Sequence, residues 1–199
     1  TNRIVLGSFQ RDTEADHVSP KIEKGPDIFA DIVEGLDANK IFVLLAGPRR
    51  EYLEERMKRA KIPYKSLGEV EFEKMRGLYG AIDRYLVTSR TEGGPQAILE
   101  CMATKTPIYS TAVGIADILE AEVILDGPDD FVDAINKPYP KVIDKHLVTA
   151  KKYSCPNVIP YYEKIFSQIV VNFQSELIDP AMVLAECPPY DGLNHDVAW

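Results

Sequence analysis

The chain has 199 residues, of which 45% are hydrophobic and 27% charged, and 31 acidic against 23 basic side chains give a formal net charge of −8. This length corresponds to one domain that buries enough apolar surface to fold without disulfides or a structural metal. The acidic balance argues against a nucleic-acid binder or an electrostatic membrane binder, because both depend on a basic surface. An anionic ligand must therefore be held by a local cluster of positive groups.

The cysteines and the hydropathy pattern indicate a reducing, aqueous setting. Cys101, Cys155 and Cys187 are odd in number and far apart, so they predict neither a disulfide framework nor a zinc site. The longest apolar runs, such as Ile41–Ala46, are too short to cross a bilayer, and no charged segment with an apolar run opens the chain. We expect a soluble, cytoplasmic protein, and a membrane-peripheral position is left open for a longer enzyme.

Short runs rich in β-branched residues recur along the chain and predict six strands. The second and fourth runs are almost continuously apolar, which is typical of strands buried on both faces. The predicted strands are Ile4–Gly7, Ile41–Ala46, Tyr64–Leu67, Tyr85–Thr88, Ile108–Thr111 and Val123–Leu125.

Amphipathic segments between these runs predict helices, the first of them starting at Gly25-Pro26. The alternation predicts an α/β fold with a doubly wound, parallel, six-stranded Rossmann-like sheet, helices on both faces and further helices at the C-terminal end. We expect one domain over residues 1–178 and an irregular, apolar tail over residues 179–199. The predicted helices are Asp27–Leu36, Arg49–Ala60, Phe72–Tyr79, Gln96–Ala103, Asp130–Asn136, Val142–Tyr153 and Val158–Phe173.

A doubly wound sheet binds its ligand beyond the carboxyl ends of the strands, where the strand order reverses. In the common order 3-2-1-4-5-6 this point lies between the first and fourth strands. The loops over residues 8–24 and 89–94 should therefore face each other.

The first of these loops contains two cations, Arg11 and Lys24, and a helix N-terminus follows Lys24 directly. The second loop contains Gly93 and Gly94, whose small size allows a close approach of the backbone to a ligand. It runs through Pro95 into a helix, where the free amides of Gln96 and Ala97 point with the positive end of the helix dipole toward the crevice. Together these groups predict an anion site that needs no metal.

Two glutamates suit the parts of the ligand beside the anion. Glu92 in the loop and Glu100 in the helix only accept hydrogen bonds, so they are suited to hydroxyl groups rather than to phosphate. A central diphosphate with hydroxylated rings on both sides describes a nucleotide sugar.

The spacing of Glu92 and Glu100 resembles the E-x7-E signature of retaining glycosyltransferases of family 4, which have the GT-B fold. The likeness spans nearly all of residues 3–170, and its central segment TSRTEGGPQAILECMA is highly specific. Further stretches resemble the donor-binding domain of that family: Gly7–Arg11, Lys24–Asp27, Leu45–Pro48, Asp83–Met102 and Pro107–Asp117.

The resemblance implies a role for each candidate residue. Arg11 and Lys24 would hold the donor diphosphate, Glu92 the hydroxyls of the donor sugar and Glu100 those of the ribose. The segment Gly94, Pro95, Gln96 and Ala97 would contact phosphate and sugar through backbone amides. In the turn over residues 68–71, Val70 and Glu71 would meet the base.

The implied reaction is transfer of a hexose, with retention of configuration, from a nucleoside-diphosphate sugar to a glycan or lipid acceptor. It implies no cofactor and no metal, and UDP-sugars are favoured over GDP-sugars. The acceptor site belongs to an N-terminal Rossmann-like domain that this chain does not supply, so the chain alone should bind donor and transfer it poorly. The apolar tail is a candidate surface for a homodimer.

Three positions depart from the family pattern. Many members have an arginine directly after the glycine that ends the first strand, where this chain has Ser8. Pro95 has no N–H to offer a phosphate. Lys105 stands where a glycine commonly ends the helix, and a positive φ there would cost about 1 kcal/mol.

Several alternatives remain open. Arg11 can be read as a solvated charge among acidic neighbours, and His17 as a solvated loop residue. The cluster of Arg49 and Arg50 with Lys58, Arg59 and Lys61 is most simply a solvated helix face. The chain can also be a non-catalytic nucleotide-sugar-binding module, a nucleotide-sugar epimerase-like enzyme, which needs an acid/base pair, or a phosphorylase, which needs a lysine-bound cofactor.

Overall fold

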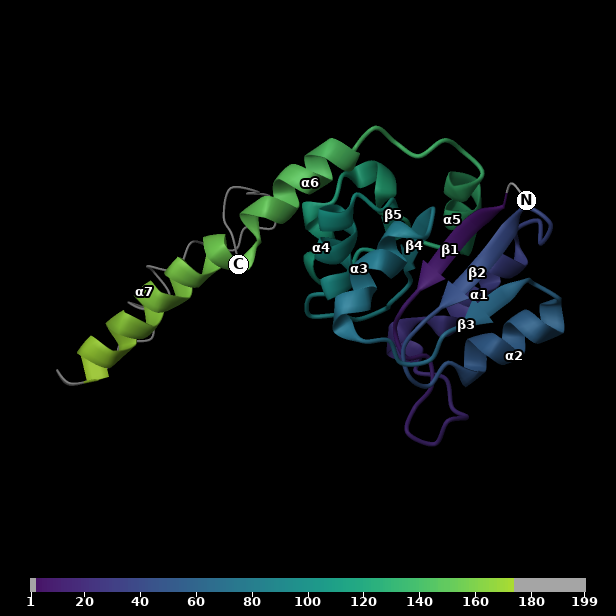
Figure 1. Ribbon diagram of the computed structural model, residues 1–199, viewed down its shortest axis with the longest axis horizontal. Helices are drawn as coiled ribbons and strands as arrows, with labels where there is room; N and C mark the ends of the chain where they lie inside the picture. Colours follow the sequence, from purple (N-terminus) through teal and green to yellow (C-terminus); the bar gives the residue numbers. More distant parts are fainter. Residues whose placement is uncertain (1–2, 174–199) are drawn as a thin grey trace. The chain divides into compact units, whose positions relative to one another are not determined.

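The computed structural model describes residues 3–173, and these contain a parallel sheet of five strands in the order β3-β2-β1-β4-β5 (Figure 1). The sheet order reverses between β1 and β4, where Leu6 lies opposite Arg84 and Gly7 opposite Tyr85. This confirms the predicted order for the first five strands. The strands are β1 (Ile4–Ser8), β2 (Ile41–Leu45), β3 (Tyr64–Ser66), β4 (Arg84–Val87) and β5 (Ile108–Ser110).

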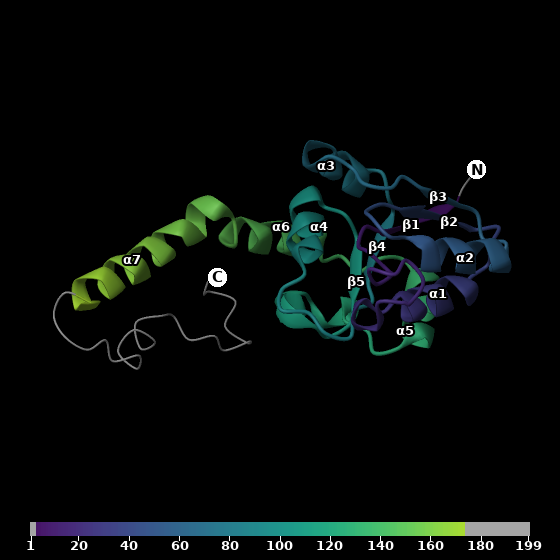
Figure 2. The same cartoon turned by 90° about the horizontal axis from the view of Figure 1, so that it is seen from below.

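Helices cover both faces of the sheet, as the alternating pattern predicts. Helices α1, α2 and α5 pack together on one face, and α3 packs with α4 on the other (Figure 2). The bounds are α1 (Pro26–Glu34), α2 (Glu51–Ala60), α3 (Phe72–Gly80), α4 (Gln96–Thr104) and α5 (Pro128–Ile135). Short 3₁₀ helices are η1 (Ile22–Lys24), η2 (Gly114–Ile118) and η3 (Ala121–Val123).

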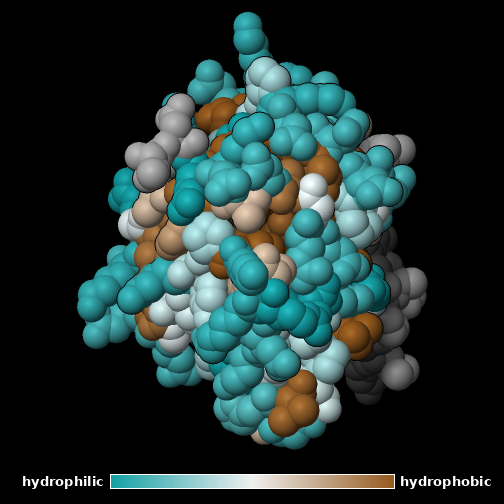
Figure 3. Space-filling model, turned by 90° about the vertical axis from the view of Figure 1, so that its right-hand side faces the viewer, coloured by the Kyte–Doolittle hydropathy of each residue, from teal (hydrophilic) through white to brown (hydrophobic). Residues whose placement is uncertain are grey.

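The core lies between these layers. All three of Tyr85, Leu86 and Val87 in β4 are buried, as expected for a strand covered on both faces. Helix α1 buries Phe29 and Ile32 against the sheet side while its outer residues stay in solvent. The surface on the side of α1 and α2 is mostly hydrophilic, with hydrophobic groups exposed between the polar ones (Figure 3).

The expected sixth strand over residues 123–125 does not form, so the six-stranded prediction was wrong. Ile124 makes a single parallel bridge with Ser110, and the N–H of Leu125 donates to the Ser110 carbonyl at 2.8 Å. At the start of β5, the Tyr139 hydroxyl accepts from the Ile108 N–H at 3.1 Å and donates to the Ile108 carbonyl at 3.0 Å. One hydroxyl thus satisfies the backbone groups that a sixth strand would have paired.

Left-handed residues lie at three helix ends in the described part of the chain, and one of them is Lys61 at the end of α2, with φ of 57°. Gly25, with φ of 61°, precedes α1, and Pro26 occupies the first turn of that helix. Lys105 ends α4 with φ of 59°, so this lysine takes the strained conformation that a glycine would adopt freely.

The chain divides into two compact units, residues up to Leu147 and residues from Val148 onward. Helix α6 (Ile143–Lys152) spans this division, and α7 (Cys155–Phe173) follows in the second unit. The sequence predicts these two helices. Within residues 3–173, no helix is both long and apolar enough to cross a membrane. The predicted tail over residues 179–199 lies outside the described residues.

Candidate functional site

The loops that follow β1 and β4 are bonded to each other at the carboxyl edge of the sheet. The Thr88 hydroxyl donates to the Gly25 carbonyl at 2.9 Å, and the Arg90 N–H donates to the Glu23 carbonyl at 2.8 Å. The Arg90 guanidinium also forms a bidentate pair with Asp27, at 2.8 and 2.6 Å. The two loops that the sequence predicts to face each other are therefore held in direct contact.

Gly25 makes this contact possible. Its φ is +61°, and a Cβ built on it would lie 1.8 Å from the Thr88 carbonyl oxygen. No other residue fits between the loops without separating them.

Lys24 reaches from the first loop to the second. Its ammonium Nζ lies 2.5 Å from Oε1 of Glu92, and the two side chains are only 25% and 12% exposed. The Ser89 hydroxyl donates to the same Oε1 at 2.9 Å, and the Gln10 amide donates to the Lys24 carbonyl at 3.0 Å. The structure thus brings together one predicted cation and one predicted carboxylate beside the glycine-rich bend.

Arg11 is placed differently. Its side chain is exposed and makes no hydrogen bond or ion pair within the described part of the chain. It follows Gln10 in the same loop as Lys24, but no contact joins it to Lys24 or Glu92. The structure therefore leaves its role in phosphate binding as a prediction.

The start of α4 borders the same bend. Pro95 has extended backbone angles and caps the helix, so the helix begins at Gln96 rather than at the proline. Gly93 and Gly94 before it are exposed, Gln96 is exposed and Ala97 is half-buried. The Ile98 N–H donates to the Pro95 carbonyl at 3.0 Å, and the amides of Gln96 and Ala97 have no partner within the helix, so an anion can bind at this end.

Glu100 lies one turn further along α4. Its Oε2 accepts a hydrogen bond of 2.6 Å from the hydroxyl of Tyr79 at the end of α3. Sequence reasoning did not identify Tyr79. Its only signal was its place on the apolar side of a predicted helix.

A second residue that sequence reasoning missed is Arg50, which is 3% exposed. Its Nη2 donates to the Ser8 carbonyl at 3.1 Å and to the Ser8 hydroxyl at 2.9 Å, and its Nε lies 3.5 Å from the Asp12 carboxylate. The expectation of a solvated cluster was therefore wrong for Arg50. Burial raises the pKa of Asp12 to about 6, although the Arg50 charge opposes the rise.

The loop after β3 lies beside the loop after β2. The Gly47 N–H donates to the Gly68 carbonyl at 2.7 Å, which ties the loops after β2 and β3 together. Val70 is half-buried, and the exposed Glu71 pairs with Lys74 at 2.7 Å. The predicted base-binding residues thus lie at the carboxyl edge of the sheet, but on its β3 side.

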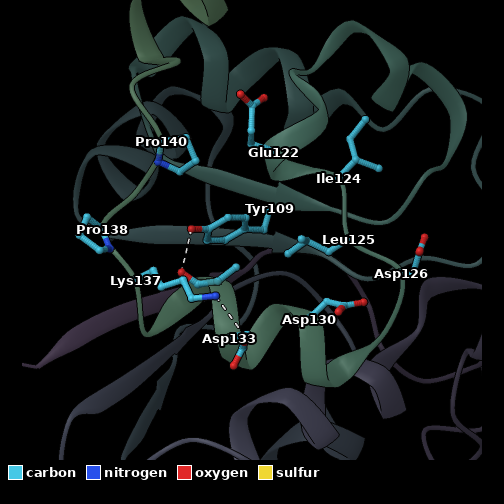
Figure 4. Close-up of a pocket in the computed structure, with 11 residues that line it drawn as sticks. Tyr109, Glu122, Ile124, Leu125, Asp126, Asp130, Asp133, Lys137, Pro138 and Pro140 are labelled. Atoms are coloured by element: carbon cyan, nitrogen blue, oxygen red, sulfur yellow. Dashed lines mark hydrogen bonds and ion pairs between the residues drawn. The ribbon is translucent and has the colours of Figure 1, made fainter.

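A separate cavity of about 460 Å³ lies between β5, η3 and α5 (Figure 4). Its lining includes Glu122, Asp126, Asp130 and Asp133, and Lys137 pairs with Asp133 at 3.1 Å. None of the site residues predicted from the sequence lines this cavity. Within residues 3–173, no three His, Cys, Asp or Glu side chains are grouped to hold a metal ion.

A comparison of the sequence with models of protein families identifies its family. The sequence model of the family described as "Glycosyl transferases group 1" matches residues 17–139, which is more than half of the chain. The chain belongs to this glycosyltransferase family. No curated protein matches the sequence significantly.

Solved structures of glycosyltransferases share the fold. Anabaena HepE in complex with UDP and glucose has a TM-score of 0.67 at 16% identity, covering 86% of this chain and 49% of HepE. A glycosyltransferase from Rickettsia africae has a TM-score of 0.70 at 16% identity, with 86% and 49% covered. The catalytic domain of cholesterol-α-glucosyltransferase from Helicobacter pylori has a TM-score of 0.61 at 12% identity, with 77% of this chain and 100% of that chain covered. The chain spans about half the length of HepE and of the Rickettsia enzyme, and at these identities the likeness establishes the fold alone.

Proposed function

We propose that this chain is the donor-binding half of a retaining, metal-independent glycosyltransferase. The donor is a nucleoside-diphosphate hexose, UDP-sugars being preferred to GDP-sugars, and the acceptor is a glycan or lipid bound by a second Rossmann-like domain. The proposal is supported by the family membership and by HepE, which was solved with UDP and glucose.

The observation that carries the proposal is the position of the Lys24 ammonium, 2.5 Å from Glu92 and between two bonded loops. A half-buried cation paired with one carboxylate has further hydrogens to donate, and a diphosphate beside it would find the helix α4 N-terminus on the other side. Charge on the leaving diphosphate would then be neutralised by Lys24, with Arg11 as the second cation from the same loop. Glu92 accepts hydrogen bonds from the hydroxyl groups of the donor sugar.

Calorimetry on the intact chain tests this proposal, with UDP, GDP and ADP and their sugar conjugates as ligands. We expect saturable binding of one nucleoside diphosphate, UDP most tightly, and the same affinity after chelation of divalent ions. If none of these ligands binds the folded chain, the proposal is wrong. If binding requires a divalent ion, the metal-independent part of it is wrong.

A second candidate is a binding module that keeps the site and transfers nothing. The observation in its favour is that the solved glycosyltransferases are only 12 to 16% identical to this chain, so they share its fold and do not establish its activity. Release of free sugar from UDP-glucose distinguishes the two candidates. A transferase half should hydrolyse the donor slowly and do so faster when supplied with the acceptor-binding half, whereas a module should do neither.

A further inference from the structure

We propose that Tyr79 is a positioning residue that orients Glu100 for the ribose of the nucleotide. Its hydroxyl donates a hydrogen bond to Oε2 of Glu100, so that Oε1 is left to accept a hydrogen bond from a ribose hydroxyl. The inference rests on the proposed function, because it concerns the same ligand.

The hydrogen bond itself is short and protected. It measures 2.6 Å, and Tyr79 is only 3% exposed. Hydrogen bonds from a neutral hydroxyl to a carboxylate are shorter and stronger than neutral ones, and shielding from water strengthens them further. A carboxylate held through one oxygen loses rotational freedom before any ligand arrives, so less entropy is lost on binding.

The Tyr79 ring is itself fixed by two aromatic neighbours. Its centroid lies 5.1 Å from that of Phe9 and 5.4 Å from that of Tyr85, and Phe9 and Tyr85 are 5.3 Å apart. Its backbone carbonyl accepts from the Thr106 hydroxyl at 2.9 Å. The hydroxyl therefore cannot leave Glu100 without disturbing the packing of a buried cluster.

This cluster also joins Glu100 to the β1 loop. Phe9 directly follows β1, and its N–H donates to the Tyr85 hydroxyl at 3.3 Å. The same loop carries Lys24 toward Glu92. One set of packed rings thus links the carboxylate on α4 with the loop that follows β1.

The protonation of Tyr79 suits this role. Burial is the largest of several effects that raise the pKa of its hydroxyl far above the ordinary value. The hydroxyl therefore stays protonated and able to donate at neutral pH. Glu100, which is half-buried, is left with one oxygen free to accept.

The test compares UDP with 2′,3′-dideoxy-UDP by calorimetry on the intact chain and on Tyr79→Phe. We expect the dissociation constant for UDP to rise about tenfold in the variant and that for the dideoxy nucleotide to change less than twofold. Tyr109→Phe is the matched control, because it removes another buried tyrosine hydroxyl, one that donates to the Ala134 carbonyl at 3.0 Å. This control should leave both affinities unchanged.

A merely structural role for the bond would give a different pattern. Equal weakening of both nucleotides by Tyr79→Phe, or no weakening of UDP, would overturn the proposal. Glu100→Gln provides a second measurement that leaves Tyr79 in place. It should weaken UDP but not the dideoxy nucleotide, and Tyr79→Phe added to it should cause no further loss. A Glu100→Gln chain that binds both nucleotides as the wild type does would contradict the role assigned to the carboxylate.

Failure of the proposed function looks different from failure of this inference. In the first case the wild-type chain binds neither nucleotide, and the inference falls with it. In the second case the wild type binds UDP and discriminates against the dideoxy form, while Tyr79→Phe retains that discrimination.

Discussion

At the scale of single residues, the proposed nucleotide binding depends on the ion pair between Lys24 and Glu92. Both residues were predictable because each belongs to a loop that follows a strand, and the carboxyl ends of neighbouring parallel strands meet at one edge. The two residues are 68 positions apart in the sequence, and in the fold the Lys24 Nζ lies 2.5 Å from Oε1 of Glu92.

Replacing Lys24 should weaken nucleotide binding selectively. Lys24→Met removes the cation and keeps the side chain's length, so we expect the dissociation constant for UDP to rise at least tenfold, with little change for uridine, which has no phosphate. Lys21→Met is the control, because Lys21 pairs with Glu14 at 3.6 Å on the same loop but does not reach Glu92. Calorimetry gives both values. UDP affinity retained in Lys24→Met would remove this lysine from the site.

Arg50 and Tyr79 show what the sequence does not reveal about single residues. Arg50 stands in a run of charged letters that reads as a solvated face, yet its side chain lies beneath the β1 loop. Burial of a polar side chain depends on which segments pack over it, and these are distant in sequence. The local periodicity of the sequence therefore does not predict this burial.

The buried pair of Asp12 and Arg50 gives the protein a specific pH dependence. Because burial raises the pKa of Asp12 to about 6, the folded state takes up a proton before the unfolded state does as the pH falls. This carboxyl therefore contributes stability that is greatest below about pH 4 and is lost as the pH rises to about 6, by at most about 3 kcal/mol.

Asp12→Asn should remove that contribution. We expect the difference in the free energy of unfolding between wild type and variant, measured by urea denaturation, to change between pH 4 and pH 6 and to stay constant above pH 7. Taking the difference cancels the opposite trend from carboxyls of lowered pKa, such as Asp27 beside Arg90. A difference that is flat from pH 4 to pH 7 would show that Asp12 is not perturbed.

At the scale of elements, the sequence predicts nearly everything that local pattern controls. Five strands and seven helices lie within a few residues of their expected bounds, because period and capping residues are local properties. The predicted sixth strand does not form, and the reason is non-local. Its place at the edge of β5 is taken by a side chain, Tyr139, which comes 31 residues after the Ile108 that it contacts.

Gly25, where the β1 and β4 loops meet, should not tolerate a side chain. Gly25→Ala places a Cβ 1.8 Å from the Thr88 carbonyl oxygen at a positive φ, so we expect it to lower the free energy of unfolding by about 3 kcal/mol or more and to weaken UDP binding. Gly77→Ala is the control, since a Cβ at Gly77 in α3 meets nothing within 4 Å and alanine favours a helix. Urea denaturation measures both. Equal stability of Gly25→Ala and wild type would mean that the two loops are not held together as described.

At the scale of the whole molecule, the Rossmann-like fold brings the loops after β1 and β4 together at the carboxyl edge of its sheet. The chain carries a net charge of −8, so the positive groups at this edge act locally and not through a general basic surface. Comparison with HepE adds that the chain spans about half the length of such an enzyme. Nucleotide binding is the property that the proposed function assigns to this chain.

The most direct measurement is a crystal structure of the chain with UDP bound. Our account predicts that the diphosphate lies between the Lys24 ammonium and the N-terminal amides of α4, with the ribose against Glu100. Electron density for UDP at another place on the folded chain, such as the acidic cavity beside α5, would contradict our account.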